Sequence, residues 1–102
     1  MSDFGLDPAI LDDIKNVLGQ FPEVLSAGIY GSRAKGTYKD SSDIDLAVHA
    51  PNMPDQSFAR LSFELNELSL IFKMDVVHVD RISNEELLLK IKRDEKIIYE
   101  KV

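Results

Sequence analysis

The sequence contains no cysteine among its 102 residues. Disulfide bonds, thiolate zinc sites and cysteine nucleophiles are therefore excluded. Basic residues are also scarce, because 12 Lys and Arg stand against 18 Asp and Glu, which gives a net charge of −6. Non-specific binding of DNA or RNA relies on a surplus of positive charge, so this balance argues against it. A nucleotide held through a metal ion is compatible with this charge, since the metal supplies the positive charge.

Long hydrophobic runs are missing as well. The longest, around residues 68–72 and 87–89, are far too short to cross a bilayer. The N-terminal residues 1–4 lack the basic start and apolar core of a signal peptide. We therefore expect a cytoplasmic protein. With 44% hydrophobic and 29% charged residues, the composition is that of a folded chain, and the length allows one small domain over residues 1–102.

Apolar residues recur at helical spacing in three stretches and alternate or cluster as in strands in four others. Asp7 followed by Pro8 indicates a helix start, and Ser83 with Glu86 three residues later is a capping box that opens another helix. The expected helices span residues 8–18, about 57–72 and 83–92, and the expected strands span residues 24–30, 44–48, 74–79 and 96–99. This order predicts an α/β fold in which helices flank a small mixed sheet.

Asp43 and Asp45 form an acidic pair at the start of the expected strand over residues 44–48. Residues separated by one position on a strand point to the same side, with Cα atoms roughly 6.5–7 Å apart. Neighbouring carboxylates repel each other, and a divalent cation such as Mg²⁺ relieves this repulsion through oxygen ligands. Asp75 opens the expected strand over residues 74–79. If the two strands are neighbours, three carboxylates converge, enough for two metal ions about 3.5–4 Å apart.

The loop ahead of the acidic pair begins with Gly31 and Ser32, directly after an expected strand. A glycine lets backbone N–H groups approach a phosphate closely, and a serine hydroxyl adds a hydrogen bond. If residues 33–35 form a helical turn, its N-terminus is a further anion site. Arg33 and Lys35 are candidate phosphate contacts, although basic loop residues are usually just solvated. A phosphate cradle joined to a carboxylate metal site by a short loop indicates Mg²⁺–nucleotide chemistry.

Four other side chains each allow two interpretations. His49 and His78 are potential ligands or bases, but each lies alone on a strand, which favours a packed or edge position. Phe63 and Leu89 fall off the apolar stripes of their helices. They are either ordinary exposed residues or part of a surface for a partner protein.

The spacing of the loop and the acidic pair resembles that of a known superfamily. Gly31-Ser32, ten intervening residues and then Asp43-x-Asp45 are similar to the signature of the nucleotidyltransferases that include DNA polymerase beta. The fuller form, Gly-Ser-Arg-Ala-Lys-Gly followed by Ser-Asp-Ile-Asp-Leu, resembles the minimal nucleotidyltransferases. These small proteins are commonly encoded beside a helical HEPN partner, in many cases as a toxin–antitoxin pair. The resemblance runs from about residue 24 to residue 79.

This resemblance implies a fold, a chemistry and roles for individual residues. The implied fold is that of the DNA polymerase beta-like nucleotidyltransferases, and the implied nucleotide substrate is ATP. Gly31 and Ser32 match the family residues that bind nucleotide phosphates. Asp43 and Asp45 match those that bind the catalytic metals, here expected to be two Mg²⁺ ions.

The third acid of the family lies on the next core strand and best matches Asp75. Asp80 lies nearby at the opposite strand phase and is the alternative. In the expected reaction, an acceptor hydroxyl attacks the α-phosphorus in line and releases pyrophosphate. One metal lowers the pKa of the acceptor and the other stabilises the leaving oxygen. Asp75 is also the expected general base.

The expected acceptor is a hydroxyl of a partner protein, because three helices over a small sheet leave no element to form an acceptor pocket. The resemblance points to a HEPN-type toxin, with the two chains forming a hetero-oligomer. The acidic net charge favours a basic partner. Two other functions stay open at this point: a non-catalytic antitoxin that acts through complex formation, and a nucleotide-sensing module that binds without turnover. Every motif position is filled, which weighs against loss of activity.

Overall fold

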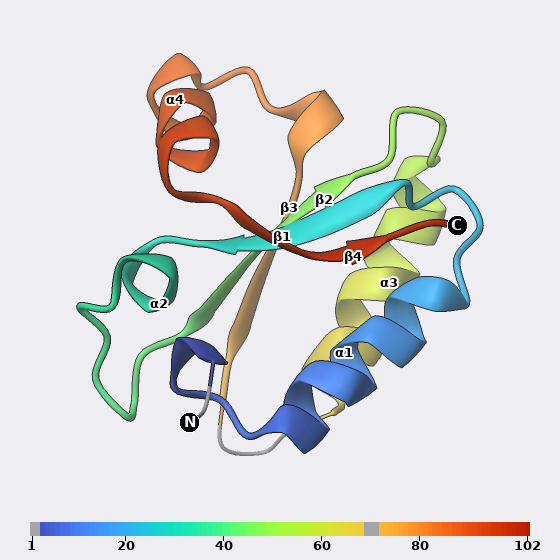
Figure 1. The fold of residues 1–102 in the computed structure, drawn as a ribbon. Coiled ribbons are helices and arrows are strands. Elements are labelled where there is room, and N and C mark those ends of the chain that lie inside the picture. Colours follow the sequence, from blue (N-terminus) through green and yellow to red (C-terminus); the bar gives the residue numbers. More distant parts are fainter. Residues whose placement is uncertain (1–2, 69–71) are drawn as a thin grey trace.

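The computed structural model describes residues 3–68 and 72–102 (Figure 1). Its helices are α1 (Pro8–Gly19), α2 (Ser32–Lys35), α3 (Asp55–Asn66) and α4 (Glu85–Asp94), its strands are β1 (Ser26–Tyr30), β2 (Ile44–His49), β3 (Met74–His78) and β4 (Lys96–Glu100), and two 3-10 turns are η1 (Asp3–Gly5) and η2 (Val79–Arg81). The predicted order of elements is confirmed, and the helical turn considered for residues 33–35 is present as α2. None of these described helices is long and apolar enough to span a bilayer.

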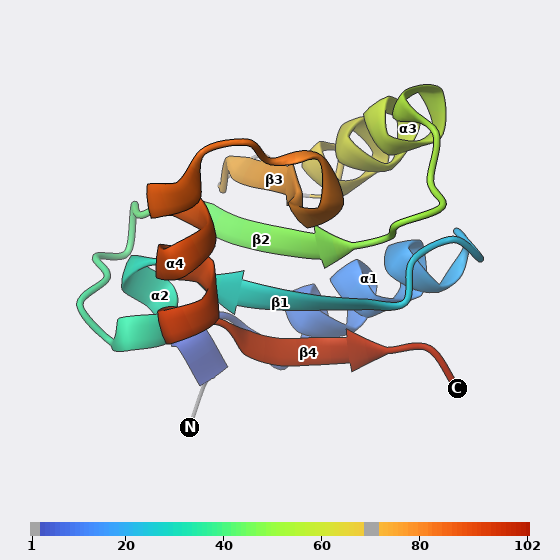
Figure 2. The ribbon, with the colours of Figure 1, turned by 90° about the horizontal axis from the view of Figure 1, so that it is seen from above.

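The four strands form one mixed sheet in the order β3-β2-β1-β4 (Figure 2). Strand β1 pairs antiparallel with both β2 and β4, whereas β2 and β3 run parallel. Helices α1 and α3 cover one face of the sheet, and α4 crosses the other face (Figure 1). The predicted fold class, helices around a small mixed sheet, is therefore confirmed.

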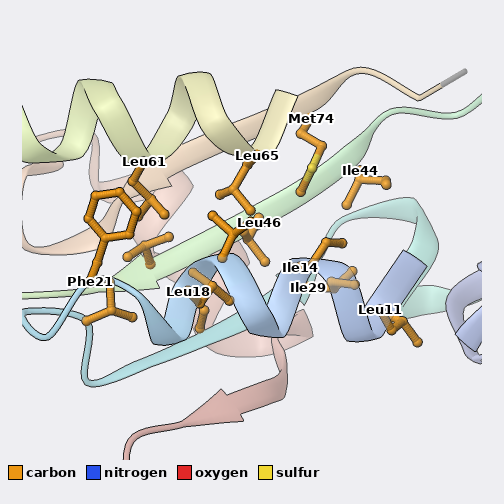
Figure 3. Packing of buried hydrophobic residues seen from close by; sticks show 14 of the residues in the cluster. Leu11, Ile14, Leu18, Phe21, Ile29, Ile44, Leu46, Leu61, Leu65 and Met74 are labelled. Carbon is orange, nitrogen blue, oxygen red and sulfur yellow. The ribbon is translucent and has the colours of Figure 1, made fainter. Parts of the chain in front are cut away.

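The main core lies between the sheet and the pair α1 and α3 (Figure 3). Alternate residues of β2, including Leu46, point into this core, and residues at helical spacing in α1, including Ile14 and Leu18, pack against them. The period of two along β2 then directs Asp45 and Ala47 to the opposite face. The burial of one face thus fixes the direction in which the acidic side chain projects.

Helix α3 is shorter than the periodicity predicts. The apolar spacing favoured a helix to Phe72, but α3 ends at Asn66. The Asn66 side-chain amide donates to the carbonyl of Ser62 at 3.0 Å, and its Oδ1 accepts from the N–H of Met74 at 3.0 Å. One side chain therefore closes the helix and holds the first residue of β3. Residues 69–71, within the predicted helix, lie outside the described residues.

The predicted capping box of α4 is wrong by one residue. Asn84, not Ser83, is the N-cap, and its side chain accepts from the N–H of Leu87 at 3.2 Å. The helix then continues to Asp94, two residues further than expected. At α1 the predicted cap is confirmed, because the Asp7 carboxylate accepts from the next-but-one N–H at 2.9 Å.

The predicted strand over residues 24–30 begins later, at Ser26. The N–H of Val24 is engaged in a turn, where it donates to the carbonyl of Phe21 at 3.0 Å. At the other end of the sheet, β3 stops at His78 because Val79 opens the turn η2. These differences shorten strands without changing which face a residue occupies.

His78 and Asp80 tie the ends of β2 and β3 together. Nε2 of His78 donates to the carbonyl of Ala50 at 2.7 Å, and the His78 ring stacks on Phe58 with centroids 4.8 Å apart. The N–H of Ala50 donates to the Asp80 carboxylate at 2.8 Å. His78 is buried, so the packed position favoured by the sequence is confirmed. The Asp80 carboxylate thus helps to hold the same two strand ends together.

Glu95 joins the end of α4 to the sheet. Its carboxylate lies 2.7 Å from Nε2 of His49, and the pair is partly buried. The Glu95 side chain passes so close to the backbone of Gly28 that a Cβ at that position would overlap it. His49 thus has the packed position expected from the sequence, and β4 starts at the next residue, Lys96.

Candidate active site

Asp45 and Asp75 are direct register partners in the parallel pair of β2 and β3. They project from the same face of strands that lie about 4.7–4.9 Å apart. Asp43 lies just before β2, and its side chain is exposed, as is that of Asp75, whereas Asp45 is half-buried. The sequence left open whether the two strands are neighbours, and the structure shows that they are. We refer to Asp43, Asp45 and Asp75 as the acidic cluster.

The surroundings of Asp45 disfavour a negative charge on its carboxyl group. Burial raises the pKa of its carboxyl group, the negative charges of Asp75 and Asp43 raise the pKa further, and the positive charge of Lys90 lowers it. The ionised form of Asp45 is therefore disfavoured in the free protein. A cation bound between these carboxylates would reverse this effect, because it stabilises the ionised form.

Tyr30 completes the face around Asp45, to which it is the register partner in β1. Burial, followed by the charges of Asp45 and Asp75, raises the pKa of the Tyr30 hydroxyl to about 12. The hydroxyl thus stays protonated at neutral pH and is available as a hydrogen-bond donor. Tyr30 was not among the site residues predicted from the sequence. Only the β1–β2 register places it opposite an aspartate, although its position directly before Gly31 was a usable signal.

Gly31 brings the backbone of the loop against the acidic cluster. Its backbone angles are φ 74° and ψ −151°, a region that side chains other than glycine rarely adopt. A Cβ on Gly31 would overlap the carboxylate of Asp45. Ser32 follows as the first residue of α2. The structure therefore unites Gly31, Ser32 and Asp45 at the end of β1.

Arg33 does not join this group. It is 2% exposed and donates from Nη2 and Nε to the carbonyl of Ser42, at 2.8 and 3.2 Å, and from Nη1 to the carbonyl of Phe4 at 2.8 Å. The rings of Tyr38 and Phe72 lie 5.3 and 4.9 Å from its guanidinium carbon. The side chain is thus an internal clamp for the loop that leads to the acidic cluster.

Replacing Arg33 by Lys is expected to lower the free energy of unfolding by roughly 2–3 kcal/mol, because a lysine cannot supply the forked donors and leaves buried carbonyls unpaired. Chemical denaturation measures this change. The matched control is Arg60→Lys, since Arg60 is exposed, forms its ion pair with Glu64 within α3 and lies 5.8 Å from the centre of the Phe21 ring. This control is expected to change stability by no more than about 0.5 kcal/mol. Equal stabilities of the two variants would refute the clamp.

Lys35 ends α2 and is exposed. Its positive charge reaches Asp94 at the end of α4 and contributes to the lowered pKa of that carboxyl group, whose main cause is the hydrogen bond from Arg93. Helices α2 and α4 lie on opposite sides of β1, and the charge at the end of α2 acts on the end of α4 (Figure 1). The candidate site therefore lies between α2, which follows β1, and α4, which crosses one face of the sheet.

The chemistry of the acidic cluster fits a divalent cation. Its potential ligands are carboxylate oxygens, which Mg²⁺ prefers, and none of the three residues has a salt-bridge partner among the described residues. In the part of the chain that the structure describes, no three acidic or histidine side chains are gathered closely enough to hold an ion. Binding a cation would therefore draw the three carboxylates together from one face of two adjacent strands.

Comparisons with solved structures identify the same fold in other proteins. A chain from the crystal structure of a toxin–antitoxin pair with AMP-PNP aligns with a TM-score of 0.73 at 24% identity, covering 89% of this chain and 73% of the other. A chain from the toxin–antitoxin complex MntA–HepT aligns with a TM-score of 0.69 at 20% identity, over 93% and 74% of the two chains. At these sequence identities, the similarity establishes a shared fold and nothing further.

A third structure holds the tri-AMPylated Shewanella oneidensis HEPN toxin in complex with MNT antitoxin. It aligns with a TM-score of 0.68 at 20% identity, over 91% of this chain and 71% of the other. A comparison with curated proteins finds no match. The model of the family described as "Polymerase beta, Nucleotidyltransferase" matches residues 12–102. Because this match extends from within α1 through every strand of the sheet, the chain belongs to the polymerase beta nucleotidyltransferase family.

Proposed function

We propose that this chain is a minimal nucleotidyltransferase that transfers AMP from ATP to a hydroxyl of a HEPN-type partner and thereby acts as an antitoxin in the cytoplasm. One observation carries the proposal: the acidic cluster faces the Gly31–Ser32 loop within a nucleotidyltransferase fold. In this proposal, residues 1–102 act as one domain. The nucleotide and the partner are supported by the fold neighbours, one of which contains AMP-PNP and another a tri-AMPylated HEPN toxin.

In this proposal the acidic cluster holds two Mg²⁺ ions, which would activate the acceptor oxygen and stabilise the leaving pyrophosphate. The N–H groups after Gly31 and the hydroxyl of Ser32 bind the β- and γ-phosphates. The acceptor oxygen forms a bond to the α-phosphorus while the bond from that phosphorus to the bridging oxygen breaks. Asp75, exposed at the edge of the cluster, accepts the proton of the acceptor hydroxyl.

The basic residues of α2 have different parts in this proposal. Arg33 is left out of the phosphate contacts, because its guanidinium donors are engaged by loop carbonyls. Lys35 is exposed beside Ser32 in the same short helix, and it is retained as a phosphate contact.

We propose that the partner protein contacts Leu89, the exposed apolar residue on the active-site side of the sheet. Phe63 and Leu89 are both exposed, at 64% and 67%. They lie on α3 and α4, which cover opposite faces of the sheet, so one flat surface cannot bury both (Figure 1). Of these two described helices, α4 is the one that crosses the face that carries Asp45 and Asp75. A partner that presents a hydroxyl to the acidic cluster would therefore pass over α4.

Co-expression of this chain with a HEPN-type protein from the adjacent reading frame tests the proposal. The two proteins are expected to co-elute, and Mg²⁺–ATP is expected to add AMP to a partner hydroxyl, because positioning of the acceptor accounts for much of the rate of such displacements. Intact-mass spectrometry detects the added AMP. The Asp43→Asn variant should still bind the partner without modifying it.

A stable pair without AMP transfer would show that complex formation alone is the function. Retention of nucleotide without transfer would indicate a sensing module. If the isolated chain adenylylates small molecules unaided, the proposal of a protein acceptor is wrong.

A further inference from the structure

A cavity of about 350 Å³ lies between η1, α2 and the beginning of β4. Two aromatic side chains, Phe4 and Tyr38, and three basic ones, Arg33, Lys35 and Lys96, line it. Among the described residues, those around the cavity include no aspartate or glutamate. The chain as a whole has a net charge of −6, so this cavity differs in sign from the rest of the molecule. Its charges favour an anion.

The aromatic wall of this cavity is held in place by contacts with α2 and the loop that follows it. Phe4 has a φ of 61°, which is uncommon for a bulky side chain. Its carbonyl accepts from Nη1 of Arg33 at 2.8 Å, and the Tyr38 ring lies so close to Gly5 that a Cβ there would overlap it. A strained backbone persists only where its surroundings fix it, so the cavity has a preformed wall.

Arg33 brings to the cavity a buried positive charge that no carboxylate neutralises. It is 2% exposed, and its guanidinium donates to the carbonyl oxygens of Phe4, Asp40 and Ser42. Carbonyl groups satisfy its N–H groups but carry no net charge, and within residues 3–68 and 72–102 Arg33 forms no salt bridge. Because a buried charge is screened less than an exposed one, it attracts an anion in the cavity more strongly.

Lys35 and Lys96 add two exposed ammonium groups. In the part of the chain that the structure describes, neither ammonium group has a hydrogen bond or a salt bridge. The charge of Lys35 also acts on Asp94, but the Asp94 carboxylate is already bound by Arg93 through two hydrogen bonds of 3.0 Å. Both lysines are therefore available to a ligand in the cavity.

We propose that this cavity binds a phosphate group, either inorganic phosphate or the phosphate of a small ester, at a site separate from the acidic cluster. Lys35 and Lys96 donate charge-assisted hydrogen bonds to the phosphate oxygens, and Arg33 contributes its charge while keeping its carbonyl partners. The site does not depend on the proposed function, since it contains none of the three carboxylates. Lys35 is also a proposed contact of the nucleotide, so Lys96 is the residue that distinguishes the two sites.

Calorimetric titration of the full chain with inorganic phosphate, without divalent metal and at constant ionic strength, tests this site. Lys96→Met is expected to raise the Kd about tenfold, because one charge-assisted hydrogen bond is lost. Lys96→Arg should recover most of the affinity. The matched control is Lys15→Met, which removes an exposed lysine of α1 that does not line the cavity. This control should bind phosphate like the wild type, and thermal unfolding should show that the variants are folded.

A second titration with phenyl phosphate identifies the source of the phosphate group. Tighter binding than that of inorganic phosphate would indicate an ester whose apolar part contacts Phe4 and Tyr38, and equal or weaker binding would indicate the free anion. The double variant Asp43→Asn, Asp45→Asn should bind inorganic phosphate with an unchanged Kd. Equal Kd values for the wild type and Lys96→Met, or no phosphate binding by the wild type, would overturn the site while leaving the proposed function in place.

Discussion

The double variant Asp43→Asn, Asp45→Asn is expected to lose nucleotidyl transfer by roughly 1,000-fold or more. An amide oxygen is a weaker ligand than a carboxylate, so the variant lacks the charge that would hold the cations. Calorimetric titration of Mg²⁺–ATP into both proteins measures the loss of binding, and the partner-modification assay measures the loss of transfer. Equal affinities of the two proteins for Mg²⁺–ATP would show that the acidic pair does not bind metal.

The same double variant should be at least as stable as the wild type without metal. The folded state raises the pKa of Asp45 above its ordinary value, so unfolding favours ionisation of this group. Asp45 therefore destabilises the fold as the pH rises from its ordinary pKa of 3.8 through the raised value, and Asn removes this effect. The control is Asp80→Asn, which removes the carboxylate that accepts from the N–H of Ala50. It should lower stability by about 1 kcal/mol and leave transfer intact.

Gly31→Ala is expected to lower transfer by about 100-fold, because a shift of about 1 Å in a positioned group is sufficient for such a loss. The added Cβ would overlap the Asp45 carboxylate, so either the loop or the carboxylate has to move. Steady-state transfer to the partner measures the effect, and chemical denaturation measures the accompanying loss of stability.

Gly36→Ala provides the matched control at the other end of α2. Gly31 and Gly36 both have positive φ, 74° and 80°, so an alanine is strained at either position, by roughly 1–2 kcal/mol in the left-handed conformation of Gly36 and by about 1–3 kcal/mol at the ψ of −151° of Gly31. Only Gly31 has a neighbour in the way, since no heavy atom lies within 4 Å of a Cβ built on Gly36. Gly36→Ala should thus lose stability but keep transfer. Similar activities of the two variants would mean that Gly31 serves only the turn.

The periodicity of apolar residues predicted those helices and strands that are amphipathic over their whole length. The alternation in β2 placed Asp45 on the face opposite Leu46, and the Asp7 cap placed the start of α1. The choice of Asp75 over Asp80 followed from the resemblance, which implies that the third acid lies on the next core strand. The register of β2 and β3 is consistent with it, because Asp75 faces Asp45 whereas Asp80 binds a backbone N–H.

The features that the sequence did not predict depend on contacts between distant segments. Arg33 is basic and lies in a polar loop, so nothing local indicates that it is buried. Its environment includes Phe4 and Phe72, which lie far from it in the sequence. The end of α3 depends in the same way on the bond from Asn66 to Met74.

The pairing of β1 with β4 joins segments separated by most of the described chain, as Ser26 and Glu100 are register partners. Closing so long a loop is entropically unfavourable, so this ladder is expected to form late in folding and to open early in local fluctuations. Glu95 connects α4 directly to β4. Opening of β4 therefore releases the end of α4, while β2 and β3 keep the carboxylates in place. A ligand that contacts both α4 and the carboxylates would slow amide hydrogen exchange in β4.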